Sequence, residues 1–337
     1  MVEITPSQVE EWSRLLQVGS LRLAEQDLRL TSLLDLIGSD EGFPVPLAFK
    51  GGTALNKLYF EDEGRLSVDL DFNALGSRDS VQQARGGIRA RLVTLVRELD
   101  PTSLIHHDHT WGLVRVAGRY DPVSGGKKDL IKVEVSMVER FPITPLVRKR
   151  FDVPGGGSGE VATYGLDELI STKLRAFYSR RKGRDLYDLV RAGGLLGDPR
   201  LLRRMAVYHF YRTGALYIPE DLRANFEEKL GDPEYLEESR LFLREGRDWN
   251  AGMAVERFRE TYGFLYHLEP REREFISLAR HLLGKVGRGE AGPLLGRERP
   301  VADLFDGFEG VTDDARSVTL EEIMVRSPSG KKGQARG

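Results

Sequence analysis

Two aspartates separated by one residue, Asp69 and Asp71, carry the clearest chemical signal in the sequence. They lie within residues 65–72 (RLSVDLDF), where polar and apolar residues alternate. Such alternation predicts a half-buried β-strand, on which both carboxylates project from the same face. Carboxylates that close repel each other, and a divalent cation relieves the repulsion. The pair is therefore a candidate site for a divalent cation; the competing interpretation is a solvated surface pair.

A glycine turn precedes these aspartates. Residues 47–49 form a short apolar run, and after the turn the apolar residues recur at helical spacing as far as Tyr59; the turn itself is Lys50, Gly51, Gly52 and Thr53. The pattern predicts a strand, a tight turn and a helix. Backbone N–H groups at the start of a helix bind phosphate well. Beside two metal-binding carboxylates, the turn predicts a site for a metal–triphosphate complex.

A later strand-like run offers a third carboxylate. Residues 131–136 (IKVEVS) place Lys132, Glu134 and Ser136 on one face and two valines on the other. Glu134 is a candidate third metal ligand. The alternative is an exposed strand glutamate paired with Lys132.

Taken together, these motifs resemble the AbiEii/AbiGii-type nucleotidyltransferase toxins, a branch of the DNA polymerase β-like nucleotidyltransferases. GGTAL at 51–55 followed by RLSVDLDF looks like the first signature of that family, and residues 131–136 look like its third acidic strand, where Asp is more common than Glu. Residues 173–188, with Lys173, Arg180 and the run RDLYDL, match its second signature. The resemblance is weak beyond residue 200.

The resemblance implies roles for these residues. Asp69, Asp71 and Glu134 would hold Mg²⁺, with Mn²⁺ as an alternative ion. The implied catalytic residues are these three with Lys173, Asp185 and Asp188, and the implied substrate-binding residues are Lys50, Gly51, Gly52, Thr53, Arg65, Ser67, Arg180 and Arg184.

An activity is implied in the same way. The chain would transfer a nucleoside monophosphate from an NTP, often a pyrimidine nucleotide, to the 3′ end of tRNA with release of pyrophosphate. That modification blocks aminoacylation and growth, so the protein would be a toxin with a cognate antitoxin. The alternatives are an enzyme that transfers the nucleotide to protein and a non-catalytic toxin that binds GTP or RNA.

Composition narrows the protein class. The absence of cysteine excludes disulfides, thiolate nucleophiles and Cys-based zinc sites. No apolar run reaches about 18 residues, and the first residues lack a signal-peptide pattern, so we expect a cytoplasmic protein without a membrane span. Three histidines at 106, 107 and 109 alternate along a strand-like run and cannot all face one ion.

The 337 residues are enough for two domains. We expect an α+β fold: a polymerase β-like core at 1–153, formed by a small mixed sheet with helices, then an all-helical domain at 161–325. The glycines of residues 154–160 predict a flexible linker between them, and residues 326–337 a disordered basic tail. Residues 318–324 predict a short last helix. Arg203, Arg204 and Arg212 are candidates for a surface that binds the phosphates of RNA.

Overall fold

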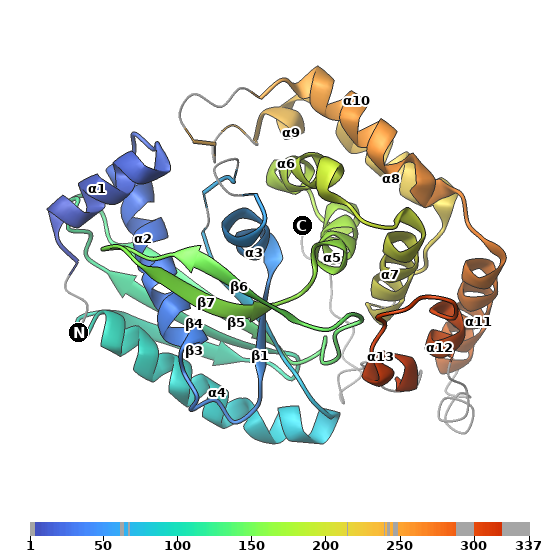
Figure 1. The fold of residues 1–337 in the computed structure, drawn as a ribbon, viewed down its shortest axis with the longest axis horizontal. Helices are drawn as coiled ribbons and strands as arrows, with labels where there is room; N and C mark the ends of the chain where they lie inside the picture. The colour runs from blue at the N-terminus through green and yellow to red at the C-terminus, as the bar shows by residue number, and fades with distance from the viewer. Residues whose placement is uncertain are drawn as a thin grey trace.

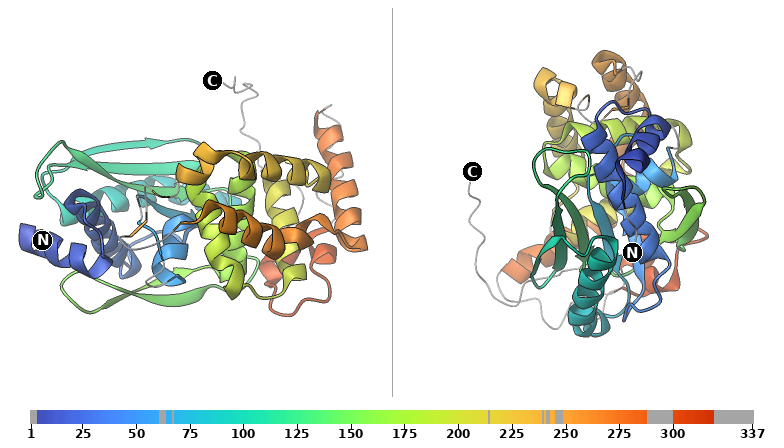
Figure 2. Two further views of the ribbon diagram at one scale, coloured as in Figure 1. Left: turned by 90° about the horizontal axis from the view of Figure 1, so that it is seen from above. Right: turned by 90° about the vertical axis from the view of Figure 1, so that its left-hand side faces the viewer.

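The chain folds into one mixed β-sheet flanked by helices and followed by a long helical region (Figure 1). In this computed structural model the described residues are 4–60, 64–66, 68–213, 215–238, 240, 243–244, 249–287 and 300–318. The expected α+β class is confirmed. Seen from above, the sheet lies at one end of the molecule and the later helices lie at the other (Figure 2).

The sheet has seven strands in the order β3-β4-β5-β2-β1-β7-β6. β2 runs parallel to β5 and β1 runs parallel to β7, while the other neighbours are antiparallel. The strands are β1 (Leu47–Lys50), β2 (Leu70–Ala74), β3 (Leu104–His109), β4 (Leu113–Tyr120), β5 (Asp129–Ser136), β6 (Val147–Asp152) and β7 (Ser158–Thr163).

Two long helices, α2 (Leu21–Gly38) and α4 (Arg78–Leu99), pack together against β4, β5 and β7. The alternation of β4 and β5 sends valines to this buried face and polar residues to the other. Gly118 permits the close approach of α4, because a β-carbon there would lie 2.7 Å from Val96. The short helix α3 (Gly51–Leu58) packs instead against β1, β2 and β6. The first helix, α1 (Pro6–Leu16), packs on α2 and starts at a capping box formed by Thr5 and Gln8.

The helical region begins directly after β7. An aromatic cluster joins its helices: Phe177 packs against Phe226, Tyr235 and Phe258. Its helices are α5 (Leu166–Ser179), α6 (Gly183–Ala192), α7 (Pro199–Arg212), α8 (Pro219–Leu230), α9 (Pro233–Glu237), α10 (Ala251–Tyr262), α11 (Pro270–Gly287), α12 (Pro300–Leu304) and α13 (Asp313–Ser317), with short 3₁₀ turns at Gly193–Leu195 and Gly263–Tyr266.

The flexible linker predicted at 154–160 is wrong. Gly155, Gly156 and Gly157 have φ values of 87°, 87° and 110° and form the turn between β6 and β7, which pair from Asp152↔Ser158 onward. Glycine supplies positive φ to a hairpin turn as readily as it supplies flexibility to a linker, so composition alone does not separate the two. The sheet therefore continues to Thr163, ten residues past the boundary at 153.

Two expectations concern segments beyond this description. The tail at 326–337 and all but the first residue of the helix expected at 318–324 lie outside the described residues. Within the described part of the chain, no helix is both long and apolar enough to cross a membrane.

Candidate active site

Strand register places acidic and basic side chains in one row across the sheet. Asp71 on β2 lies directly beside Glu134 on β5, and Lys50 on β1 lies on the other side of Asp71. Arg115 on β4 is paired with Glu134 and donates from its Nε to Glu134 Oε1 at 2.7 Å. Directly paired residues share one face of a sheet. The two carboxylates that the sequence separates by more than sixty residues therefore meet on one face.

Asp69 lies just outside the strand. The strand predicted over 65–72 is wrong at its start, because β2 begins at Leu70. The side chain of Asp69 still reaches the same cluster: its Oδ2 lies 3.3 Å from Lys132 Nζ, which lies 3.3 Å from Glu134 Oε1. The carbonyl of Asp69 accepts a hydrogen bond from Thr53 Oγ1 at 2.6 Å, and this contact ties the segment to α3.

The pKa of Asp71 is raised, as expected for a carboxylate at a cation site. Burial, together with the charges of Asp69 and Glu134, raises the pKa of Asp71 to about 6, although Lys50 and Lys132 act in the opposite direction. The loss of a proton from Asp71 is thus opposed by two neighbouring carboxylates. A bound cation would relieve this cost.

The glycine turn lies against these carboxylates. β1 ends at Lys50 and α3 starts at Gly51, with no side-chain hydrogen bond capping the start of the helix. Gly51 has a φ of +80°, and a β-carbon on it would stand 2.5 Å from Asp71 Oδ2. The uncapped helix N-terminus and the acidic cluster are therefore immediate neighbours, as the sequence predicts.

Gly52 faces a different group, a buried ion network. A β-carbon on Gly52 would lie 2.3 Å from Arg65 Nη2, 3.1 Å from Asp188 Oδ2 and 3.3 Å from Lys173 Nζ. Arg65 donates to both oxygens of Asp188, at 2.9 and 2.8 Å. Asn56 joins the network by donating to Asp188 Oδ1 at 3.0 Å and accepting from the backbone N–H of Arg65 at 2.6 Å. The network fixes the start of α3 and the segment leading to β2 to the helical region.

Lys173 lies inside this network. Only 5% of its side chain is exposed, and its Nζ lies 2.8 Å from Asp188 Oδ2 and 3.1 Å from Asp185 Oδ1. Burial alone would raise the pKa of Asp188, but Arg65 and Lys173 outweigh it and hold that pKa below its ordinary value. Both cations are thus committed to the buried carboxylates.

Arg180 is the more accessible cation of the second signature. Its side chain is 47% exposed and forms two hydrogen bonds to Asp185, at 2.8 and 2.9 Å. The hydrogen bond to Asp185 raises the pKa of Arg180, and the charges of Asp71 and Asp69 raise it further, so the guanidinium lies within the field of the acidic cluster. Arg184, on α6, is partly buried and engaged in a contact of its own.

Lys50 is bonded to a carboxylate outside the acidic cluster. Its Nζ donates to Glu139 Oε2 at 2.7 Å, and Arg175 donates to the other oxygen of the same carboxylate at 3.2 Å. Burial would raise the pKa of Glu139, but Lys50 and Arg175 outweigh it and hold that pKa well below its usual range. Glu139 and Arg115 were not among the predicted site residues, because isolated charged residues in a loop and a strand give no distinguishing pattern. Ser67, which was predicted to bind substrate, lies outside the described residues.

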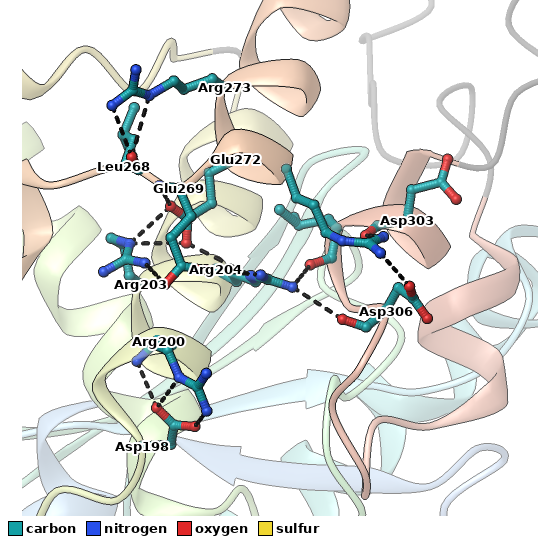
Figure 3. Close-up of polar contacts among 12 residues, drawn as sticks. Asp198, Arg200, Arg203, Arg204, Leu268, Glu269, Glu272, Arg273, Asp303 and Asp306 are labelled. Carbon is teal, nitrogen blue, oxygen red and sulfur yellow. Dashed lines mark hydrogen bonds and ion pairs between the residues drawn. The ribbon is translucent and has the colours of Figure 1, made fainter.

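The basic surface predicted from Arg203, Arg204 and Arg212 is wrong, because all three side chains are buried; Figure 3 shows the contacts of Arg203 and Arg204. Arg203 donates to Glu272 at 2.8 Å, and Arg204 donates to the carbonyl of Leu304 at 2.8 Å. Arg212, also buried, bonds the carbonyl of Val138 and the hydroxyl of Tyr208. Apart from Tyr208 on α7 itself, these partners come from α11, α12 and the loop after β5, so the sequence near α7 could not reveal that the arginines are internal.

The donors present suit a hard divalent cation, although the site is not preassembled for one. Among the described residues, no three His, Cys, Asp or Glu side chains are gathered as around a metal ion. The ammonium of Lys132 lies between Asp69 and Glu134 and shows that one cation is able to reach both carboxylates. Carboxylate oxygens are the ligands that Mg²⁺ and Mn²⁺ prefer. Asp69, Asp71 and Glu134 therefore fit such an ion chemically.

Comparisons with known proteins identify the family and similar folds. The family described as nucleotidyl transferase AbiEii toxin, type IV TA system, matches residues 33–262. Among solved structures, MenT4, a nucleotidyltransferase toxin of Mycobacterium tuberculosis H37Rv, has 21% identity and a TM-score of 0.58, covering 86% of this chain and all of the other. A candidate nucleotidyltransferase from Helicobacter pylori has 19% identity and a TM-score of 0.45, covering 74% of this chain and 99% of its own. No curated protein matches the sequence.

Proposed function

Since the chain belongs to the AbiEii nucleotidyl transferase toxin family of type IV toxin–antitoxin systems, we propose that it transfers a nucleoside monophosphate from an NTP to a hydroxyl at the 3′ end of tRNA, with release of pyrophosphate. One observation carries the proposal. Asp71 and Glu134 are paired across β2 and β5, with Asp69 beside them, directly against the uncapped start of α3 at Gly51. A triphosphate and a hard cation both find their preferred partners there.

The acidic cluster has the first role. Asp69, Asp71 and Glu134 would hold Mg²⁺, or Mn²⁺, which when bound supplies charge neutralisation at the triphosphate and polarises the acceptor oxygen. Glu134 is kept in place at 2.7 Å by Arg115, whose side chain is 41% exposed, and we assign the acceptor to this more exposed end of the row.

The start of α3 has the second role. Backbone N–H groups of Gly51, Gly52 and Thr53 are available to phosphate oxygens because no side chain caps the helix. Arg180, half-exposed and within the field of the aspartates, is the cation best placed to reach the departing pyrophosphate.

The buried network has a positioning role. Lys173, Arg65, Asp185 and Asp188 fix Gly52 and the approach to β2 through contacts of 2.8–3.1 Å. We assign to them the maintenance of this arrangement, with Arg184 on the same helix. Lys50, bound to Glu139, moderates the charge of Asp71 in the next strand.

The proposed acceptor and nucleotide rest on the resemblance of the two sequence signatures to the family. Their resemblance favours tRNA and a pyrimidine nucleotide, and the family's type IV classification implies a cognate antitoxin.

The test is incubation of the full chain with total tRNA and each α-³²P-labelled NTP in turn. We expect label in tRNA, strongest with CTP or UTP, and dependent on added Mg²⁺. Label in protein would instead identify an enzyme that modifies proteins. Nucleotide binding without any labelled product would identify a non-catalytic toxin.

A further inference from the structure

A lysine lies where the proposed metal would bind. Lys132 sits on β5, two residues before Glu134 and on the same face. Its Nζ is 3.3 Å from Asp69 Oδ2 and 3.3 Å from Glu134 Oε1. Charge-assisted hydrogen bonds are usually about 2.7–2.9 Å long. The ammonium therefore bridges both carboxylates without the close contact that it would make with one.

Lys132 is not needed to hold Glu134. Arg115 already donates to Glu134 Oε1 at 2.7 Å, and the same guanidinium lies 3.2 Å from Asp108 Oδ2 on β3. Arg115 faces Glu134 from β4, and Lys50 faces Asp71 from β1 while it is bonded to Glu139. Neither cation forms an ion pair with Asp69.

Asp69 depends on Lys132. Among the described residues, Lys132 forms the ion pair with the Asp69 carboxylate. Without that ammonium, Asp69 would face Asp71 and Glu134 with no ion-pair partner, and only the more distant charge of Arg180 would act on it. The lysine thus supplies the positive charge that the three carboxylates require when no metal is present.

We propose that Lys132 is an internal substitute for the divalent cation: its ammonium occupies the space between Asp69 and Glu134 in the metal-free protein, and metal binding displaces it. This inference rests on the proposed metal site. An ordinary lysine is fully charged at neutral pH. Metal affinity is therefore set by competition between the cation and the Lys132 ammonium. The lysine stabilises the metal-free state and so weakens metal binding.

Solvent is accessible to the displaced side chain. The neighbour of Lys132 on β4, Ala117, is itself buried, so the displaced ammonium would move toward solvent. The Lys132 side chain is 30% exposed, so the ammonium reaches water without a rearrangement of the core.

The experiment measures metal binding by the full chain without nucleotide. Mn²⁺ is titrated by calorimetry into the unaltered protein, Lys132→Met and, as matched control, Lys128→Met; Lys128 forms a surface pair of 3.2 Å with Asp121 just before β5. Removal of a like charge a few ångströms from the ion should tighten Mn²⁺ binding by about tenfold or more. The control should bind as the unaltered chain does.

Thermal unfolding gives a second readout. In EDTA, Lys132→Met should unfold at a lower temperature than the control, and Mn²⁺ should restore more of its stability than it adds to the unaltered protein. Lys132→Gln serves if the methionine variant does not fold, and Lys132→Arg, which keeps the charge, should bind Mn²⁺ as weakly as the unaltered chain.

Unchanged or weaker Mn²⁺ binding in Lys132→Met or Lys132→Gln would overturn the proposal. Failure of the proposed function is distinguishable, because it would appear as a lack of labelled RNA whatever the metal affinity. If the unaltered chain bound no Mn²⁺, the metal site itself would be rejected.

Discussion

Gly51, at the junction of β1 and α3, lies directly against Asp71 on β2. A β-carbon at Gly51 would stand 2.5 Å from Asp71 Oδ2, and the φ of +80° at this position already disfavours any other residue. The contact brings the start of a helix to a carboxylate pair. A triphosphate bound to the start of α3 would therefore lie beside the metal-binding carboxylates.

Substitution at Gly51 should therefore affect NTP binding. Gly51→Ala forces Asp71 or the turn to move, so we expect NTP affinity to fall about tenfold or more while the fold is kept. Calorimetry with a non-hydrolysable NTP measures this. Gly86→Ala on α4 is the control: nothing lies within 4 Å of its β-carbon, and the change should stabilise the helix by about 0.5–1 kcal/mol without altering NTP binding. Equal NTP affinity in both variants would place the phosphates elsewhere.

The buried network predicts a large effect on stability. Asp188→Asn leaves Arg65 and Lys173 buried with a neutral partner, and breaking a buried pair costs about 3–5 kcal/mol. Urea unfolding gives the free energy directly. Glu160→Gln removes an exposed pair with Arg148 and should cost about 1 kcal/mol or less. A similarly small loss in Asp188→Asn would show that the network does not fix α3.

The pKa of Asp71 predicts a pH dependence of stability. Its folded-state pKa, about 6, lies above the value of 3.8 for a free aspartate. An acid with a raised pKa contributes stability that is complete below the unfolded value and is lost as pH rises through the folded value. In EDTA, the unaltered chain should therefore lose stability relative to Asp71→Asn between about pH 4 and pH 6. Thermal melting of both proteins across that range measures the difference, and a constant difference would contradict the shift.

The arginines of α7 should matter for folding and not for RNA binding. Arg203→Ala leaves Glu272 buried beside a weakened set of partners, so we expect a loss of about 3 kcal/mol or more in stability. The salt dependence of tRNA binding should stay as in the unaltered chain, measured at a temperature where the variant is folded. A flatter salt dependence of tRNA binding with unchanged stability would show that Arg203 belongs to an RNA-binding surface.

The sequence predicted the parts of the site that depend on local pattern. Alternation in residues 131–136 predicted β5 and the outward direction of Glu134, and the Gly51-Gly52 turn before a helical pattern predicted the junction with α3. The shared face of two residues on one strand, and a strand followed by a helix, both appear as local periodicity in the sequence. They can therefore be predicted without knowledge of the fold.

Contacts between segments distant in the sequence could not be predicted from local periodicity. The three glycines at 155–157 fit a linker as well as a hairpin, and only the pairing of Phe151 with Gly159 on β6 and β7 decides between them. Arg203 was predicted to lie on the surface because its buried partner, Glu272, is 69 residues away and local sequence does not show the pair. The position of Lys132 between two carboxylates likewise depends on where Asp69 falls after a loop, which periodicity does not give.

The measurement that tests the central claim most directly is transfer of label from an α-³²P-NTP to tRNA by Asp71→Asn. The variant should keep its fold by circular dichroism and lose at least about a thousandfold of activity, of the order seen when a principal electrostatic stabiliser is removed. Glu134→Gln, its partner across the strands, should lose activity with it. Transfer by both variants at close to the unaltered rate would contradict the assignment of the acidic cluster as the catalytic site.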